Sequence, residues 1–469
     1  MTTLENSDKA AATLATSAPK KLSLLDKVAF GTGDLASQLV WTTTSSYLAV
    51  FYTDMVGLSA ASVGLLILLA RIVDAFIDPF VGAAAERTQS RFGRFRTWIL
   101  RFSPVLSILM VLTFMTVPGS TTVKFIYAIV TYGLLGIVYS MVNVPYGSLV
   151  TVMTTDPKER MELGSFRMVG MNIGVVGLSL GTMPLILALS KSTDGTPTIE
   201  GYTGAVAIFA VVALALFLLV AWRCKEVVKN PTRGVSLKQT FAAVATNKPL
   251  MLVFAMMFLV LTGFFGRLGV AVFYLIYNVG RYDLIAPAMA LPSIGAIIGI
   301  AAFTPMVNRL GKKKGLAISL VGQSAFLVAL YLVGWDNPTL VLVLSFFYGV
   351  ANFGSPIFFG MIPECIDYAA EKTGVRTDGS AFATVSLATK AASAVGGAVG
   401  VMAIGAFGFI ANQEQSIETL NGINLVTNIF PVIITLLAFI PLALYPLTEK
   451  RYAEVRARLD AKTAAGRED

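Results

Sequence analysis

Two aspartates lie four residues apart in a largely apolar stretch. Asp74 and Asp78 occur within residues 59–85, and this spacing places both carboxylates on one face of a helix. Arg71 shares roughly that face, and Pro79 interrupts the backbone hydrogen bonds directly after Asp78. An ionisable side chain in a bilayer costs about 2.5–3.5 kcal/mol to insert, so such residues usually mark a transport pathway. The pair could bind Na⁺ together with hydroxyl or amide oxygens, or carry a proton, because two close carboxylates do not easily both ionise.

The two carboxylates also have a structural alternative, which is to neutralise Arg71 and Lys390 across a helix bundle. Lys390 could instead take part in coupling, by releasing or pairing with a carboxylate as the bundle moves. The chain has no histidine, so a transported proton would have to be carried by a carboxylate. Arg101 and Arg267 also lie in apolar stretches; they could snorkel to the interface or pair, and we assign them no role.

Other polar and aromatic residues in apolar stretches admit two interpretations each. Asp34 ends the glycine-rich run 31–34 and would contact either a polar ligand or a neighbouring helix. Ser140 and Asn143 share a helix face ahead of Pro145, and such residues either line a pathway or hold helices together. Aromatic side chains could stack on a sugar ring or serve as packing and interface anchors. These are Trp41, Tyr47, Tyr52, Tyr146, Phe265 and Tyr274.

The composition excludes most functional classes. The chain has 469 residues, of which 55% are hydrophobic and 13% charged, and its mean hydropathy is +0.74. Soluble domains carry about 25% charged residues, so a soluble enzyme, a nucleic-acid binder and a disordered regulator are excluded. Cys224 and Cys365 form neither a disulfide framework nor a metal-ligand cluster. Without histidine or a cysteine cluster, a membrane-embedded enzyme is disfavoured, and no cofactor is expected beyond a co-transported cation.

Twelve stretches are long and apolar enough to cross a bilayer, which requires about 20 residues. We therefore expect an all-α membrane protein with twelve transmembrane helices. The predicted spans are 28–53, 59–85, 98–117, 122–151, 164–190, 203–222, 249–279, 285–307, 315–334, 338–362, 381–410 and 422–446.

The distribution of cations predicts the orientation. With both termini and the loops after even-numbered spans assigned to the cytoplasm, that side carries 28 of the 36 Lys and Arg residues. The opposite side carries only Lys124, Lys191 and Arg281, and five cations fall inside spans. This excess is what the positive-inside rule requires. We expect a multi-pass protein of the cell membrane with both termini in the cytoplasm.

A short repeat indicates two related halves. Residues 91–96 (RFGRFR) and 309–314 (RLGKKK) both follow the second span of a six-span group and fit the pattern R-x-G-[RK]-x-[RK]. Two pseudo-symmetric six-helix bundles joined by a basic linker are the arrangement of major facilitator transporters, whose substrate site lies near the midplane. We expect five units: the N-terminal cytoplasmic tail (1–27), the first bundle (28–222), the linker (223–248), the second bundle (249–446) and the C-terminal cytoplasmic tail (447–469). Within the N-terminal tail, residues 1–20 are expected to be disordered.

The pattern resembles that of the glycoside–pentoside–hexuronide:cation symporters, a family of the major facilitator superfamily, over nearly the whole chain. The most specific elements are residues 71–82 (RIVDAFIDPFVG) and 87–98 (RTQSRFGRFRTW). Further matches are Gly33-Asp34, 52–59 (YTDMVGLS), 143–145 (NVP), 166–167 (FR), 366–368 (IDY), 373–376 (TGVR) and Lys390.

The resemblance implies roles for individual residues. Asp74 and Asp78 match the two cation-site carboxylates of the family, Ser140 a cation-site threonine, and Lys390 a lysine near that site. Arg167 matches an arginine of the sugar pocket, where carboxylates on the first and fourth helices hold sugar hydroxyls. On the first helix the counterpart of that carboxylate is Asp34, or it is Gln38 if the two sequences are aligned without a gap. Asp34 and Gln38 lie one helical turn apart. The fourth helix departs from the pattern, with Asn143 at the carboxylate position and Gly147 in place of a tryptophan.

The function expected is cation-coupled (H⁺ or Na⁺) symport of a sugar or glycoside by alternating access, with Na⁺, if used, at Asp74 and Asp78. The alternative is an uncoupled facilitator, or an exporter of another small solute, on the same fold. Basic loop residues could form a cytoplasmic gate by pairing with acids such as Glu86. We expect a monomer in the lipid bilayer that binds no nucleic acid. The predicted gate residues are Arg91, Arg94, Arg309 and Asp367.

Overall fold

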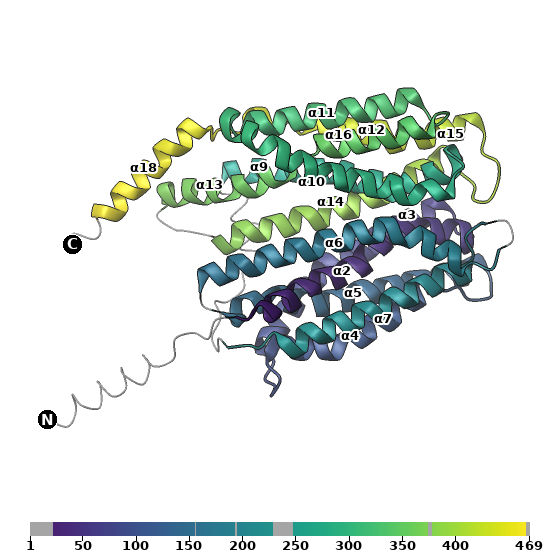
Figure 1. Cartoon of the computed structure of the whole chain (residues 1–469), viewed down its shortest axis with the longest axis horizontal. Coiled ribbons are helices and arrows are strands. Elements are labelled where there is room, and N and C mark those ends of the chain that lie inside the picture. Colours follow the sequence, from purple (N-terminus) through teal and green to yellow (C-terminus); the bar gives the residue numbers. More distant parts are fainter. Residues whose placement is uncertain (1–21, 155, 193–194, 228–246, 374–377, 466–469) are drawn as a thin grey trace.

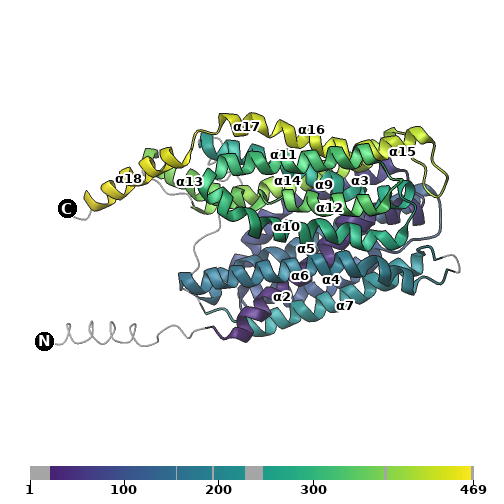
Figure 2. The same cartoon turned by 45° about the horizontal axis from the view of Figure 1, so that its top comes forward.

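Two helical bundles lie next to each other, and their helices run roughly along the long axis of the molecule (Figures 1 and 2). The computed structural model describes residues 22–154, 156–192, 195–227, 247–373 and 378–465, and all regular secondary structure in these ranges is helical. The expected all-α fold is therefore confirmed. The disordered segment expected at residues 1–20 and most of the linker 223–248 lie outside the described residues.

The first bundle contains the first six spans. Side-chain oxygens of Ser23, Ser59, Ser120 and Thr198 accept backbone N–H groups at the starts of four of its helices, which satisfies donors that have no partner inside the helix. Its elements are α2 (Leu24–Val50) with the π-helical turn η1 (Phe51–Met55), α3 (Ala60–Arg87), α4 (Arg94–Thr113), α5 (Thr121–Met153), α6 (Pro157–Leu189) and α7 (Ile199–Arg223).

The second bundle repeats this organisation with more interrupted helices. The tenth span is divided at residues 352–354, and the twelfth consists of several short segments. Its elements are α9 (Lys248–Phe273), η2 (Tyr274–Asn278), η3 (Tyr282–Leu284), α10 (Ile285–Leu310), α11 (Lys312–Val333), α12 (Pro338–Ala351), α13 (Ser355–Thr373), α14 (Asp378–Ala406), α15 (Ile417–Asn424), η4 (Leu425–Ile429), α16 (Phe430–Leu437) and α17 (Phe439–Leu444), followed by α18 (Glu449–Ala465).

Each predicted span corresponds to a helix or a continuous run of helices. Among the described residues, eleven of these helices or runs of helices are both long enough and apolar enough to cross a membrane. The first span, α2, is long enough but is not among the eleven. Some helices extend beyond the predicted limits, since α6 begins at Pro157 rather than 164 and α13 continues to Thr373 rather than 362. Hydropathy detects only the apolar part of a helix, whereas backbone hydrogen bonding continues into the polar turns beyond it.

The two basic loops adopt the same conformation in each half. Gly93 and Gly311 have φ of 102° and 88°, values that favour glycine, and each lies immediately before a helix. The Glu226 carboxylate accepts the N–H groups of residues 94–96 at 2.8–3.0 Å, and Glu449 accepts the first N–H of α11 at 2.5 Å. Each glutamate follows the last span of its half, so it ties the end of the bundle to the start of its third helix.

Close contacts between helices of the first bundle depend on glycine. A Cβ on Gly31 of α2 would lie 2.6 Å from the Phe166 carbonyl oxygen of α6, and one on Gly170 of α6 would overlap the Gly31 carbonyl oxygen. The backbones of α2 and α6 therefore touch directly. This contact holds α6 against α2 at the level of the polar residues that both helices contribute.

We predict that Gly170→Ala lowers the free energy of unfolding by about 1–3 kcal/mol, because the added methyl group must separate the α2 and α6 backbones. The measurement is thermal or chemical unfolding of the purified protein in detergent. Gly177→Ala on the same helix is the matched control, since a Cβ there meets no atom within 4 Å. Equal stabilities of the two variants would contradict the contact.

Candidate functional site

Four residues predicted for the cation site come together between the bundles. Asp74 and Asp78 lie on α3, Ser140 on α5 and Lys390 on α14. The Lys390 ammonium forms an ion pair with Asp78 Oδ2 and lies 3.8 Å from Asp74 Oδ2. Ser140 donates a hydrogen bond of 2.5 Å to Asp74 Oδ1. Asp74 is only 4% exposed, so its charge depends on these two partners.

The arrangement leaves one carboxylate oxygen available. Asp78 Oδ1 is buried and has no hydrogen-bond partner among the described residues. The two carboxylates and the Ser140 hydroxyl form a cluster of oxygens of the kind that a hard cation prefers. Lys390 currently supplies the positive charge at this position, so a proton or Na⁺ would compete with the ammonium group. Of the two bases in the structural alternative, Lys390 is the one that forms ion pairs with these carboxylates among the described residues.

A second polar cluster joins α2, α5 and α6. Asp34 Oδ2 and Oδ1 accept hydrogen bonds from Arg167 Nε at 2.5 Å and from its terminal nitrogen at 3.1 Å. The Tyr146 hydroxyl lies 2.8 Å from Asp34 Oδ2 and 2.7 Å from the Phe30 carbonyl oxygen. The Arg167 guanidinium lies 5.0 Å from the centre of the Tyr146 ring. The structure thus pairs the two charged residues predicted for the sugar site.

The other two predicted sugar ligands lie near Asp34 but make different contacts. Asn143 Oδ1 accepts a hydrogen bond of 3.2 Å from Ser37, and its side-chain nitrogen donates to no group among the described residues. Gln38 Oε1 accepts a hydrogen bond of 2.8 Å from Thr42 on the same helix, and its stem packs against Gly174. Each amide therefore accepts one hydrogen bond through its oxygen, and neither side-chain nitrogen donates to a group among the described residues.

The aromatic candidates separate into two groups. Tyr47 and Tyr52 are almost fully buried, and Tyr274 donates a 2.7 Å hydrogen bond to the Gly334 carbonyl, which makes these three packing residues here. Tyr146 is also buried, but it belongs to the cluster around Asp34. Trp41 lines a small pocket between α2, α3 and α5, together with residues that include Arg71, Asp74, Tyr132 and Tyr139. Its ring lies 6.5 Å from that of Phe265, on α9 of the other bundle.

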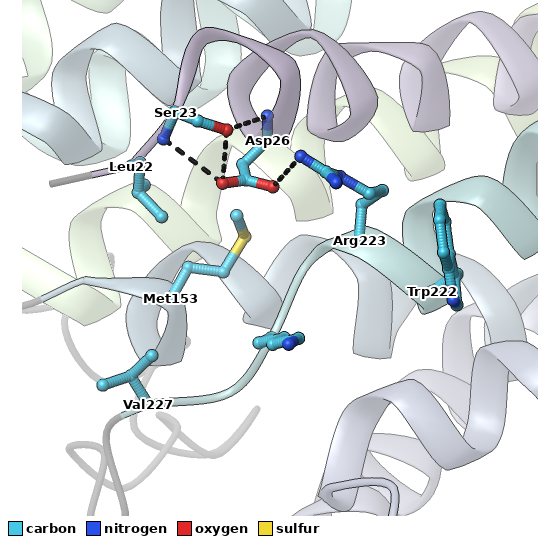
Figure 3. A pocket seen from close by; sticks show the side chains of 8 residues that line it. Leu22, Ser23, Asp26, Met153, Trp222, Arg223 and Val227 are labelled. Carbon is cyan, nitrogen blue, oxygen red and sulfur yellow. Dashed lines mark hydrogen bonds and ion pairs between the residues drawn. The ribbon is translucent and has the colours of Figure 1, made fainter. Parts of the chain in front are cut away.

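A larger pocket occurs where α2 begins, at the end of the first bundle away from these clusters (Figure 3). Asp26 in its wall pairs with Arg223 at 3.0 Å and receives hydrogen bonds from Ser23, so the charges of this ion pair are already balanced. Trp222 and Met153 complete much of the lining. Because the pocket is remote from the buried acid–base clusters, we assign it no part in transport.

At the opposite end, where α2 ends, polar contacts join the two halves. We call this the distal end, defined by Asp54, Tyr277 and Asn412. The Tyr277 hydroxyl donates to Asp54 Oδ2 at 2.7 Å and accepts the Asn412 N–H at 3.0 Å, while the Asn412 side chain donates to the Asp54 carbonyl at 2.5 Å. Sequence reasoning assigned no role to this group, although Asp54 lies directly after the first span and within the matched residues 52–59.

The basic gate stays a prediction. Asp367 accepts a 2.7 Å hydrogen bond from Tyr452 and pairs with Arg456 at 3.3 Å, both on α18. Arg91 lies over the Phe92 ring, and the backbone N–H of Arg94 bonds to Glu226. Helix α18 has a strongly polar sequence that hydropathy could not place against α13.

Comparison with known families identifies the protein class. A family model described as MFS/sugar transport protein matches residues 29–449. The chain belongs to this sugar-transport family of the major facilitator superfamily. The expected resemblance is confirmed, and this sugar transporter is a multi-pass membrane protein.

Two curated relatives cover nearly the whole transporter. An uncharacterized symporter of Bacillus subtilis (strain 168), YnaJ, is 34% identical over 446 residues, which is 94% of this chain and 96% of the relative. A glucuronide carrier protein homolog of Escherichia coli (strain K12) is 29% identical, over 94% of this chain and 96% of the relative. A solved bacterial homolog of the human lysosomal transporter Spinster, in an inward-facing and occupied conformation, has a TM-score of 0.62 at 15% identity, covering 90% of this chain and 95% of that chain. This last likeness shows the shared fold.

We predict that Lys390→Gln lowers the free energy of unfolding by about 3–5 kcal/mol, because the buried Asp74 and the partly buried Asp78 lose their cation. Adding Asp78→Asn should recover part of the loss, since it removes one of the unpaired charges. Unfolding in detergent measures both variants. Arg281→Gln, which breaks an exposed pair with Asp283, is the control and should have little effect. A double variant no more stable than Lys390→Gln would contradict the ion pair's role.

Proposed function

We propose that this sugar transporter is a symporter that couples H⁺ or Na⁺ to the movement of a sugar or glycoside by alternating access. The observation that carries the proposal is the placement of Asp74, Asp78 and Ser140 against Lys390 between the bundles. Buried ionisable residues in a membrane are costly, and here they occur at the interface that must rearrange during transport. Helices from both halves contribute, so occupancy of this cluster affects how the halves pack.

Cation binding acts on the Lys390 ion pair. A proton or Na⁺ at Asp74 and Asp78 supplies the positive charge that Lys390 provides in the present conformation. Lys390 is then free to move with α14, while Ser140 stays with the cation and the carboxylates on the first bundle. The interaction between the two halves therefore differs between the occupied and empty states, which is the requirement for a ligand to shift a conformational equilibrium.

The substrate site lies next to this cluster on the same helices. Ser140 and Asn143 are three residues apart on α5, and Asn143 approaches α2 through Ser37. A change in the position of α5 on cation binding therefore also changes the substrate ligands, which include Asp34 and Arg167. Cation and substrate should each raise the affinity for the other by the same factor.

We further propose that both chain termini are cytoplasmic and that the transporter acts as a monomer, because the two halves that enclose the site belong to one chain. The distal end then faces the outside of the cell. Hydrogen bonds among Asp54, Tyr277 and Asn412 join the two halves on that side, so they act as an outer closure in the conformation described here.

The alternative function is uncoupled facilitation or export of another small solute. The feature that favours it is the Lys390 ion pair, which already neutralises Asp78 without an added cation. A facilitator would equilibrate the solute without accumulating it, whatever the cation gradient. Uptake driven by an imposed H⁺ or Na⁺ gradient discriminates between the two.

We predict that Asp74→Asn and Asp78→Asn each reduce cation-driven accumulation in proteoliposomes at least tenfold, because an amide neither carries a proton nor balances the charge of Na⁺. Exchange of labelled sugar for unlabelled sugar should be better preserved, since it needs no net cation movement. Asp283→Asn is the control, because that carboxylate is exposed and lies outside the site. Undiminished accumulation by both site variants would refute coupling at this cluster.

We predict that Tyr277→Phe opens the distal end, because it removes two hydrogen bonds of that closure and keeps the ring contact with Phe409. The readout is labelling of an added Thr44→Cys, a buried site below the closure, by a membrane-impermeant thiol reagent in intact cells. The labelling rate should rise severalfold.

Two features of the chain serve as controls for this measurement. Tyr127→Phe removes a tyrosine hydrogen bond to Leu112 within the first bundle and should leave labelling unchanged. The native cysteines should stay silent, because both are buried and burial raises the pKa of the Cys224 thiol to about 12. Equal labelling rates in the Tyr277 and Tyr127 variants would exclude the proposed closure.

A further inference from the structure

The pocket where α2 begins is built from three separate parts of the first bundle (Figure 3). They are the residues at the start of α2, the last residue of α5, and the end of α7 with the chain that follows it. Asp26 belongs to the first part, Met153 to the second, and Trp222, Arg223 and Lys225 to the third. The pocket has a volume of about 440 Å³, which is in the range of ligand sites in proteins.

This pocket lies at the boundary of the membrane. Helix α7 is long and apolar enough to cross a bilayer and ends at Arg223, so Trp222 lies in the last turn of a membrane-spanning helix. Trp222 is 69% exposed, and Leu24 and Leu25 at the start of α2 are each 66% exposed. Tryptophan is enriched where the lipid head groups meet the hydrocarbon. The pocket is therefore at the level of the head groups, on the side that we have proposed to be cytoplasmic.

The lining of the pocket carries more positive than negative charge. Asp26 Oδ1 pairs with a terminal nitrogen of Arg223 at 3.0 Å, and its Oδ2 accepts the Ser23 hydroxyl at 2.6 Å. Lys225 is exposed and pairs with no carboxylate among the described residues. The carboxylate of the next residue, Glu226, accepts the N–H groups of residues 94–96 instead. Two cations and one acid therefore leave the lining with one net positive charge.

Both cations keep hydrogen-bond donors for a ligand. Arg223 gives one terminal nitrogen to Asp26, and its guanidinium lies 5.9 Å from the centre of the Trp222 ring. A guanidinium has five N–H groups and an ammonium has three, so most of these donors have no partner among the described residues. Apolar side chains, Met153 and Val227 among them, line the same pocket. A ligand that satisfies both kinds of surface is an anion attached to an apolar body.

We propose that this pocket binds the phosphate of an anionic phospholipid from the cytoplasmic leaflet. The phosphate oxygens accept hydrogen bonds from Lys225 and from the free N–H groups of Arg223, and such charge-assisted bonds are the strong ones. The acyl chains extend over the exposed apolar surface at Trp222. Phosphatidylglycerol has the one negative charge that balances the lining, whereas the ammonium group of phosphatidylethanolamine cancels the charge of its own phosphate.

A lipid in this position joins segments that are distant in the sequence. The start of α2, the end of α5 and the chain after α7 all contact it, so it holds one end of the first bundle together. A ligand that binds only the folded state raises the stability of that state. The pocket is remote from Asp74 and Lys390, so this role does not depend on the proposed symport.

The test measures lipid binding to the purified full-length transporter by native mass spectrometry, together with the rise in its thermal unfolding temperature. The probes are palmitoyl-oleoyl phosphatidylglycerol, the phosphatidylethanolamine with the same chains, and inorganic phosphate. The first phosphatidylglycerol molecule should bind about tenfold more tightly than phosphatidylethanolamine, and Lys225→Gln should weaken that binding about fivefold. Lys225→Arg should retain most of it. Lys191→Gln, which removes an exposed cation at the other end of the bundle, is the matched control.

Each contrary outcome decides against the lipid site. Equal affinities of the wild type for the two lipids would overturn it without the use of any variant. Equal weakening in Lys225→Gln and Lys191→Gln would also overturn it, because the lipid would then respond to the overall charge of the protein. A thermal shift of the same size with inorganic phosphate would show a site for free anions rather than for lipid. A shift that requires phosphatidylglycerol and Lys225 supports the site, whatever the cation dependence of transport.

Discussion

The low dielectric of the bilayer is the constraint on which the rest of this structure depends. Charged side chains in that environment must find partners, and the partners of Asp74 and Asp78 come from another helix of the same bundle and from the opposite bundle. The Lys390 ion pair is thus at once a stabilising contact and a contact between the parts that must move. In the proposed symport, a cation that replaces the lysine would change the packing of the halves without any other group having to transmit the effect.

The first bundle combines rigid packing with this adjustable interface. Gly31 and Gly170 bring α2 and α6 into backbone contact, which holds Asp34 and Arg167 in register for two hydrogen bonds. The proposed substrate ligands therefore belong to a tightly packed unit, whereas the cluster of Asp74, Asp78 and Lys390 extends to the second bundle. This division suits a transporter whose site keeps its shape while the halves move around it.

Much of the fold could be predicted because it follows from local composition. Apolar length located the spans, and the basic loops predicted the orientation and the repeat. The resemblance implied a cation cluster and a sugar pocket, and the structure brings those residues together in two neighbouring groups. Spacing could not supply the partner of each charge. Arg71 stacks on Trp41 rather than pairing with an aspartate, and Asp367 contacts α18.

The sequence by itself predicted a twelve-span membrane protein that resembles a family of sugar transporters, and which acidic and basic residues occur in its apolar spans. Only the tertiary structure decided that Lys390 serves both carboxylates, that Arg71 is without a carboxylate partner, and that Asp54 and Tyr277 close the distal end. The physical reason is the sequence separation over which each kind of interaction acts. Hydropathy and helical periodicity act over a few turns of one helix, whereas ion pairs and hydrogen bonds between bundles join residues more than 200 positions apart.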